Sequence, residues 1–261
     1  MTFRSLLCLT LLVSSAAIAE PVAVTGKIDL FNGKNLDNWY TFIRDRGKNI
    51  DPKKVFTVAD GLLTISGEEW GCITTTEEYD AYKLVTEWRW DGRTYGNRVD
   101  KTRDSGIVVH SVGEDGGYSN VWMFGIECQI IEGGAGDFIV VGNGSQDFSL
   151  TAKIAEEKQG SSFVFDPKGK EETINGGRIN WWGRDADWKD EINFRGAKDV
   201  ESPMGEWNHM ECIVDGGAIT VYLNGVLVNE SVASKPDNGK IQVQAEGAGI
   251  IFRKIELHPL K

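Results

Sequence analysis

Residues 210–228 read MECIVDGGAITVYLNGVLV, and this stretch decides the fold class. Two apolar-rich runs, Met210 to Val214 and Ile219 to Leu223, are separated by Gly216-Gly217, and Asn224-Gly225 leads into a third run. Gly-Gly and Asn-Gly are dipeptides that favour tight turns between antiparallel strands. The stretch therefore predicts three consecutive strands joined by hairpins.

The same pattern extends outward along most of the chain. Asp60-Gly61 joins two further short apolar runs, and the chain contains 31 glycines and 26 aromatic residues, which suit many short strands and tight turns. The other predicted strands are 55–58, 62–65, 83–90, 105–112, 124–131, 241–245 and 250–257. Strands that recur with turns between them predict an all-β sandwich or barrel, not a βαβ fold.

Two segments between these strands are less regular. Residues 150–159 predict one short helical turn or a loop, and residues 160–202 predict a long insertion of loops and short strands. Neither segment shows the Pro-rich or low-complexity character of a linker. We therefore expect residues 20–261 to form a single domain.

The first nineteen residues predict a signal peptide. Arg4 precedes an apolar run that is too short to span a bilayer, and Ala17-Ile18-Ala19 is a small-x-small cleavage site before Glu20. These features predict a periplasmic or secreted protein. No other stretch is apolar enough to predict insertion into a membrane.

The charge of the chain argues against some partners. Without Arg4, the mature chain carries 27 basic and 39 acidic residues, a net charge of −12. Such a surface repels nucleic acid and anionic membranes. We expect a monomer or a weak homo-oligomer.

Three cysteines, Cys72, Cys128 and Cys212, remain in the mature chain. Their number is odd and their spacing is not that of a metal site. Cys128 and Cys212 lie in apolar strand patterns, so we expect buried free thiols.

Polar side chains follow one face of several predicted strands. Because side chains alternate between the two faces of a strand, Glu127 and Gln129 lie opposite Cys128. The same alternation places Glu87 and Arg89 on one face of their strand. It also places Gln242, Gln244 and Glu246 on one face of theirs. His110, in the predicted strand 105–112, adds a titratable group. One interpretation is an ordinary solvated face. The other is a saccharide groove, since carboxylates and amides bind sugar hydroxyls and aromatic rings stack on sugar rings.

The sequence resembles the 3-keto-disaccharide hydrolase domain family over about residues 30–260. The landmarks are LFNGKNLDNW (30–39), DGLL (60–63), DSGI (104–107), IECQI (126–130), GEWN (205–208), LNG (223–225) and FRKI (252–255). The resemblance implies a concanavalin-like jelly-roll sandwich of two antiparallel sheets, bacterial export and cleavage of 3-keto-glycosides by hydrolysis or elimination. Asp104, His110 and Glu246 depart from the commoner family pattern of Asn, Arg and His.

A 3-keto-glycoside is cleaved by proton removal at C2 and β-elimination of the C1 substituent, which requires a base, an acid and a group that holds the enolate. We predict Glu127 and His110 as the proton-transfer pair, with Arg253 or Arg89 at the enolate. The predicted catalytic residues are Glu127, His110 and Arg253, and the predicted substrate-binding residues are Gln129, Glu87, Arg89, Gln244, Glu246, Trp122 and Trp182.

The cofactor and two other functions stay open at this stage. A divalent cation, calcium or a transition metal, is a candidate cofactor, with Glu127, His110, Glu246 and Asp137 as candidate ligands. A non-catalytic lectin-like module that binds carbohydrate is the main alternative, and a conventional glycosidase with two facing carboxylates is another. No Gly-x-Ser-x-Gly motif indicates a serine nucleophile.

Overall fold

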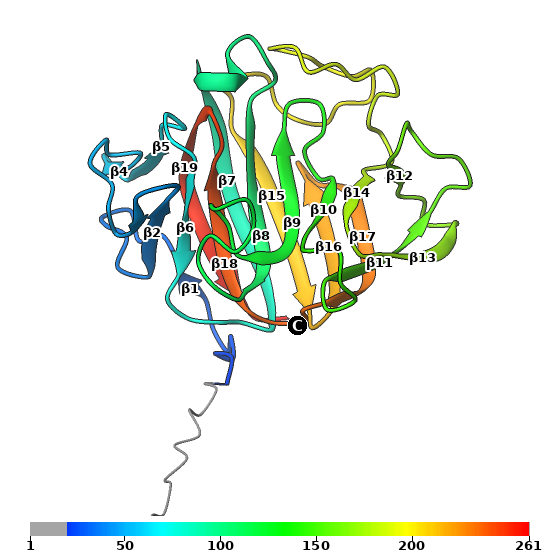
Figure 1. Cartoon of the computed structure of the whole chain (residues 1–261), viewed down its shortest axis with the longest axis horizontal. Coiled ribbons are helices and arrows are strands. Elements are labelled where there is room, and N and C mark those ends of the chain that lie inside the picture. The colour runs from blue at the N-terminus through cyan, green and yellow to red at the C-terminus, as the bar shows by residue number, and fades with distance from the viewer. Residues whose placement is uncertain (1–19, 261) are drawn as a thin grey trace, which may run out of the picture.

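Two β-sheets packed face to face make up the fold, which is known from a computed structural model that describes residues 20–260 (Figure 1). The predicted signal peptide, residues 1–19, lies outside the described residues. Sheet A contains β7 (Ala81–Thr94) and sheet B contains β9 (Phe124–Ile131). The predicted all-β jelly-roll sandwich is confirmed.

Sheet A has ten strands in the order β13-β11-β17-β16-β15-β7-β19-β5-β4, with β1 paired to β19. Besides β7, its strands are β1 (Ile28–Asp29), β4 (Phe56–Ala59), β5 (Leu62–Ile65), β11 (Ser149–Ile154), β13 (Lys170–Ile174), β15 (Asn208–Asp215), β16 (Ala218–Leu223), β17 (Val226–Lys235) and β19 (Ala248–His258).

Sheet B has nine strands in the order β12-β14-β10-β9-β8-β18-β6-β2-β3. Besides β9, its strands are β2 (Trp39–Ile43), β3 (Gly47–Lys48), β6 (Gly71–Thr75), β8 (Asp104–Val112), β10 (Phe138–Val141), β12 (Phe163–Val164), β14 (Gly177–Asn180) and β18 (Lys240–Ala245). All pairings are antiparallel except that of β12 with β14. A short 3₁₀ helix, η1 (Gly96–Arg98), follows β7.

The predicted hairpins form where the turn dipeptides stand. β15, β16 and β17 pair consecutively, and Asn224 and Gly225 both have positive φ, at 51° and 82°. Asp60 and Gly61, between β4 and β5, also have positive φ. Two successive positive φ values match the right-handed twist of a hairpin, which explains why Asn-Gly and Asp-Gly were informative.

The segments between the hairpins give one confirmed prediction and one correction. The insertion 160–202 contains the short strands β12, β13 and β14 among loops, as predicted. The helical turn or loop predicted for residues 150–159 is wrong for its first half, because residues 150–154 belong to β11, while residues 155–159 form a loop. β11 pairs with both β13 and β17, and this tertiary pairing outweighs the weak local pattern.

The core lies between the two sheets. Trp88 and Trp90 point inward from β7 with their ring centroids 5.3 Å apart in an edge-to-face arrangement. Cys128 and Cys212 belong to the same core, and all three described cysteines are buried free thiols, as predicted. Because side chains alternate along a strand, every second residue of the sheet B strands points to the outer face of that sheet, which carries the candidate site.

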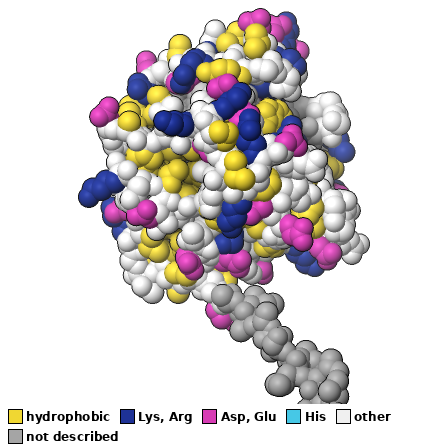
Figure 2. All heavy atoms as spheres, turned by 60° about the vertical axis from the view of Figure 1, so that its left-hand side comes forward, with side chains coloured by type: hydrophobic (Ala, Val, Ile, Leu, Met, Phe, Trp, Pro, Cys, Tyr) yellow, Lys and Arg dark blue, Asp and Glu magenta, His cyan; other side chains and the backbone are white. Residues whose placement is uncertain are grey.

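The outer surface is mixed in charge. Figure 2 shows basic and acidic side chains interspersed over one side of the molecule, with apolar side chains between them. Within residues 20–260, no helix combines the length and the hydrophobicity that a membrane span requires.

Candidate functional site

The outer face of sheet B carries a band of buried polar side chains. Ile126, Cys128 and Ile130 of β9 point into the core, so Glu127 and Gln129 point outward. The outward residues of β18 include Gln242 and Gln244, and Glu246 follows the strand on the same face. Glu127 and Gln129 are only 4% and 3% exposed, so this face is covered and is not an ordinary solvated surface.

The two polar strands approach each other across β8. In the sheet register, Glu127 lies beside Val108 of β8, and Gln129 lies beside Gly106. Gly106 has no side chain, and a Cβ at this position would overlap both the Glu127 carboxylate and the Gln244 amide. The two functional groups therefore meet over β8 in the space left by this glycine.

Three acidic side chains form what we call the carboxylate cluster: Asp104, Glu127 and Glu246. Asp104 is at the start of β8 on the same outer face. One oxygen of Asp104, one oxygen of Glu127 and both polar atoms of the Gln244 amide are buried and make no hydrogen bond within residues 20–260. Because buried polar atoms are nearly always paired in proteins, these atoms are expected to bind water, an ion or a polar ligand.

The carboxylate cluster is electrostatically unusual. Burial, together with the nearby Asp104 carboxylate, raises the pKa of Glu127 to about 8. Burial raises the pKa of Asp104 to about 7, while Arg98 opposes this change. Burial, Asp104 and Glu127 raise the pKa of Glu246. Asp104 and Glu127 therefore exchange protons near neutral pH, which allows one carboxyl group of the cluster to be an acid while another is a base.

Two guanidinium groups border the carboxylate cluster. Arg98 of η1 is 2.9 Å from Asp104 and also contacts Asp190 at 3.3 Å. Arg178 of β14 interacts electrostatically with both Glu127 and Asp104 and is held by Asp137 at 2.7 Å. The site thus has a fixed positive group on each of two sides.

Asp137 organises one side of the site. Its carboxylate, which is completely buried, accepts hydrogen bonds from Arg178, from Arg184 and from the backbone N–H of Trp181. The sequence had suggested Asp137 as a metal ligand. In the structure, both of its oxygens are used to hold the insertion 160–202 against β10.

Comparison with known proteins identifies the family. The model of the 3-keto-alpha-glucoside-1,2-lyase-like domain matches residues 26–258. The chain belongs to this family. A comparison with curated proteins found no match.

Solved structures agree with the lyase-like family on the fold. A "putative glycosyl hydrolase" from Parabacteroides distasonis is 20% identical, with 90% of this chain and 94% of that chain covered and a TM-score of 0.54. A second structure so described from the same organism is 22% identical, with coverages of 90% and 99% and a TM-score of 0.49. The β-glucanase of Bacillus licheniformis is 10% identical, with coverages of 90% and 99% and a TM-score of 0.46. The first of these structures shares the overall fold of this chain.

The structure of this lyase-like domain brings together four of the predicted site residues. Glu127, Gln129, Gln244 and Glu246 share the outer face of sheet B, although the Gln129 amide oxygen already accepts the N–H of Ile130. Their roles stay predictions.

The predicted pair of Glu127 and His110 is not formed. His110 lies at a β-bulge in β8 with a φ of 53°, and its side chain is completely buried on the inner side of sheet B. Its Nδ1 is 3.3 Å from the hydroxyl of Ser234, which belongs to sheet A. The bulge rotates His110 toward the sandwich interior, so it cannot exchange a proton with a group on the outer face.

His110 predicts a measurable acid sensitivity. Burial lowers its pKa from 6.5 to about 4, although Asp237 and Asp80 oppose this change. The unfolded chain therefore binds more protons than the folded chain between pH 6.5 and 4, so stability falls as the pH falls. Between pH 7 and 4, we expect the wild type to lose about 3 kcal/mol more unfolding free energy than His110→Asn.

Urea denaturation at several pH values measures this difference. Asparagine is a suitable replacement because it tolerates positive φ and does not titrate. Equal pH slopes for the two proteins would show that His110 has no such effect.

Glu87, Arg89 and Arg253 lie elsewhere than predicted. They are on the outer side of sheet A, where Arg253 pairs with Glu87 and both arginines contact the ring of Trp207 at 4.9 and 4.4 Å. Strand alternation correctly placed Glu87 and Arg89 on one face. It could not show that this face belongs to the sheet opposite to that of Glu127.

The two tryptophans that were predicted to bind substrate, Trp122 and Trp182, lie in different parts of the structure. Trp122 packs between Trp70 and Tyr118 beside Cys72, which is the register neighbour of Gln244, so it adjoins the site. Trp182 is 39% exposed and donates its indole N–H to the carbonyl of Leu227 in sheet A. Trp182 therefore does not belong to the carboxylate cluster.

The predicted divalent cation has no assembled ligand set in the part of the chain that the structure describes. No group of three or more His, Cys, Asp or Glu side chains there has the arrangement of a metal site. Arg98 and Arg178 supply positive charge beside the carboxylates.

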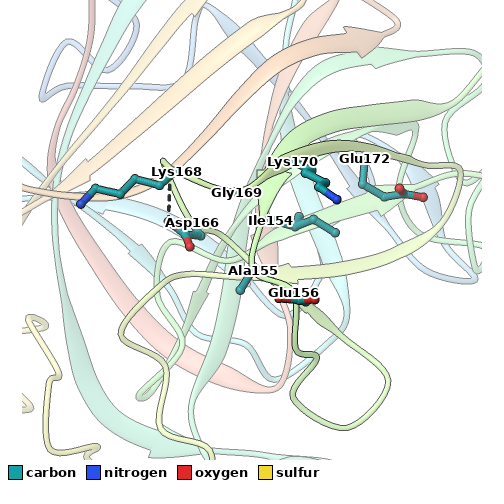
Figure 3. Close-up of a pocket in the computed structure, with 8 residues that line it drawn as sticks. All are labelled: Ile154, Ala155, Glu156, Asp166, Lys168, Gly169, Lys170 and Glu172. Carbon is teal, nitrogen blue, oxygen red and sulfur yellow. Dashed lines mark hydrogen bonds between the residues drawn. The ribbon is translucent and has the colours of Figure 1, made fainter.

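A pocket of about 400 Å³ lies at the edge of sheet A, between β11 and β13. Figure 3 shows that its charged side chains, among them Lys168, Lys170 and Glu172, point in different directions. Because these groups do not converge, this pocket is not a comparable site.

Sequence reasoning missed Arg98 and Arg178 and gave Asp104 no role. Asp104 was detectable, because it is two residues before Gly106 and therefore on the same strand face as that glycine. Arg178 alternates with the inward Ile179 in β14, but this strand was hidden in the irregular insertion. Arg98 is in a turn, and no periodicity could locate it.

Proposed function

We propose that this protein cleaves 3-keto-glycosides by elimination across C1 and C2, at the site formed by the carboxylate cluster. The supporting observation is the convergence of Glu127 and Gln244 over Gly106, with buried unpaired oxygen and nitrogen atoms and two bordering guanidinium groups. A neutral, hydroxyl-rich sugar ring offers the hydrogen bonds that these atoms lack.

Glu127 in its ionised form takes the proton from C2 of the sugar. The electron pair of the broken C2–H bond passes to the ketone at C3 and forms an enolate. The high pKa of Glu127 makes its carboxylate a stronger base than an ordinary glutamate, which favours this step.

Arg178 is the group that stabilises the enolate, because it interacts with Glu127 and is fixed by the buried Asp137. This assignment moves the role predicted for Arg253 to a guanidinium within the same site. The arginine needs no rearrangement during the reaction, since its position is set before the substrate binds.

The enolate then expels the C1 substituent. The C1–O bond breaks, a double bond forms between C1 and C2, and a protonated carboxyl group of Asp104 or Glu246 gives its proton to the leaving oxygen. The product at this point is an unsaturated 3-keto sugar. Addition of water, with hydroxide at C1 and a proton at C2, completes a net hydrolysis.

Paired substrates test this proposal. We expect a 3-keto-disaccharide to be cleaved and the same disaccharide without the ketone to remain intact, because only the ketone acidifies the C2 proton. Product analysis with and without a chelator, in deuterated water, also separates elimination from direct displacement, since elimination followed by hydration incorporates deuterium at C2. Equal cleavage of the two disaccharides would contradict the proposal.

A carbohydrate-binding module without catalysis is the second candidate. The separation of Glu127 from His110 favours it, because the proton-transfer pair expected from the sequence is not formed. This candidate predicts that a 3-keto-disaccharide binds, as measured by calorimetry, and is recovered unchanged.

We also propose that the protein acts after export, in the periplasm or outside the cell, because Ala17-Ile18-Ala19 precedes Glu20 as a cleavage site would. Mass spectrometry of the protein from its native host should find Glu20 as the first residue. A mature chain that begins at Met1 would contradict this proposal.

A further inference from the structure

Gly106 occupies a position where the backbone does not require glycine. It lies inside β8, and its φ is outside the positive range that disfavours residues with side chains. An alanine could adopt this backbone conformation. The surroundings of Gly106, and not its backbone conformation, therefore explain why a glycine is present.

That space is filled by two functional groups. A Cβ at Gly106 would overlap the Glu127 carboxylate and the Gln244 amide oxygen, and it would lie 3.0 Å from Glu127 Cδ. The three atoms nearest to this Cβ position all belong to the Glu127 and Gln244 side chains, and none is a backbone atom. The missing side chain thus makes room for the site and not for the packing of the sheet.

We propose that Gly106 is a positioning residue: its lack of a side chain lets the Glu127 carboxylate and the Gln244 amide lie together over β8. This inference rests on the proposed function in one respect, which is that Glu127 is the residue that transfers the proton. The geometric part holds for any ligand of this site.

An added methyl group should change the electrostatics of Glu127 in a known direction. Asp104, Asp137, Arg178 and Gln244 surround this carboxyl group; Arg178 and the Gln244 amide lower its pKa, while Asp104 and Asp137 raise it. A methyl group between Glu127 and Gln244 separates the carboxylate from the amide and excludes further solvent. Both changes raise the pKa of Glu127.

Gly125 offers a matched control. It lies in β9 of the same sheet, its φ is also outside the positive range, and a Cβ there would lie 2.7 Å from the carbonyl oxygen of Val109 and 2.9 Å from Val108 Cγ1. Gly125→Ala therefore strains the sheet, and the three atoms nearest to the added Cβ belong to Val108, Val109 and His110, not to Glu127 or Gln244. It shows what general damage to sheet B does.

The experiment compares the wild type, Gly106→Ala and Gly125→Ala by ¹³C NMR titration of the Glu127 carboxyl group and by kinetics on a 3-keto-disaccharide. We expect Gly106→Ala to raise the pKa of Glu127, to shift the pH profile of kcat/KM with it, and to lower kcat/KM by about 10²-fold. Gly125→Ala should lower the melting temperature and leave the titration and the pH profile unchanged.

The two readouts separate the two proposals. An inactive wild type contradicts the proposed function, and the NMR titration then still decides the role of Gly106. A Glu127 titration that is the same in Gly106→Ala as in the wild type overturns the inference, whatever the activity.

A shorter acid provides a second measurement. Glu127→Asp removes one methylene group and should restore the melting temperature of Gly106→Ala, but not that of Gly125→Ala. If Gly106→Ala alone does not fold, recovery of folded protein in the double variant supports the inference, and no recovery contradicts it.

Discussion

Replacing Glu127 with glutamine is expected to lower kcat on a 3-keto-disaccharide by about 10²–10⁴-fold, the usual contribution of a group that transfers a proton. The amide has the shape of the carboxyl group but cannot accept the C2 proton. Binding should change little, because the neighbouring Gln244 and Gln129 remain in place. Single-turnover kinetics together with calorimetric titration measure the two effects separately.

The same variant should be more stable than the wild type at alkaline pH. Burial raises the pKa of Glu127 from 4.5 to about 8, so the folded protein binds more protons than the unfolded chain between these values. The wild type therefore loses stability as the pH rises through this range, and Glu127→Gln does not. We expect a gain of about 2–4 kcal/mol in unfolding free energy at pH 9 and almost none at pH 4.

Glu211→Gln is the control for both measurements. Glu211 lies in β15 of sheet A, pairs with Lys83 at 3.6 Å, and has no contact with the carboxylate cluster. Its replacement should change neither the turnover nor the alkaline stability by more than about 0.5 kcal/mol. A Glu127→Gln variant with the turnover of the wild type would remove Glu127 from the mechanism.

Replacing Asp137 with asparagine is expected to have the largest effect on stability, a loss of about 3–5 kcal/mol of unfolding free energy. Arg178 and Arg184 both depend on this carboxylate, and Arg184 is itself buried. Without the negative charge, two guanidinium groups remain close together with no adequate partner. Chemical denaturation at pH 7 measures the loss.

The substitution should also lower kcat, since Arg178 would no longer be fixed beside Glu127. Asp147→Asn is the control, because Asp147 is exposed in the loop before β11 and its replacement should cost less than about 0.5 kcal/mol. A loss below about 1 kcal/mol in Asp137→Asn would mean that the insertion is held by other contacts.

Local signals in the sequence predicted the fold class and many of the strands and turns. The Asn-Gly and Asp-Gly dipeptides mark turns because these residues accept positive φ, and the alternation within β9 separates Glu127 from the core residues Ile126 and Cys128. These properties depend on a residue and its immediate neighbours. These local properties do not depend on how the strands are arranged. Strands can therefore be predicted before their pairing partners are known.

The composition of the site was predicted less completely. Glu127, Gln129, Gln244 and Glu246 were found because they alternate with apolar residues on strands that prove to be in one sheet. The identical signal at Glu87 and Arg89 belongs to the other sheet. Alternation tells which residues share a face of one strand, but it carries no information about which strands share a sheet.

Local patterns along the chain therefore predicted many of the strands, their turns, the family motifs and the strand face that carries Glu127. The packing of the two sheets established that Arg178 and Arg98 border the carboxylate cluster, that His110 turns inward at a bulge, and that Gly106 leaves the space in which the site is assembled. The physical reason is that these relations join residues distant in sequence through strand order, register and loop closure. Such relations are fixed only when the two sheets pack.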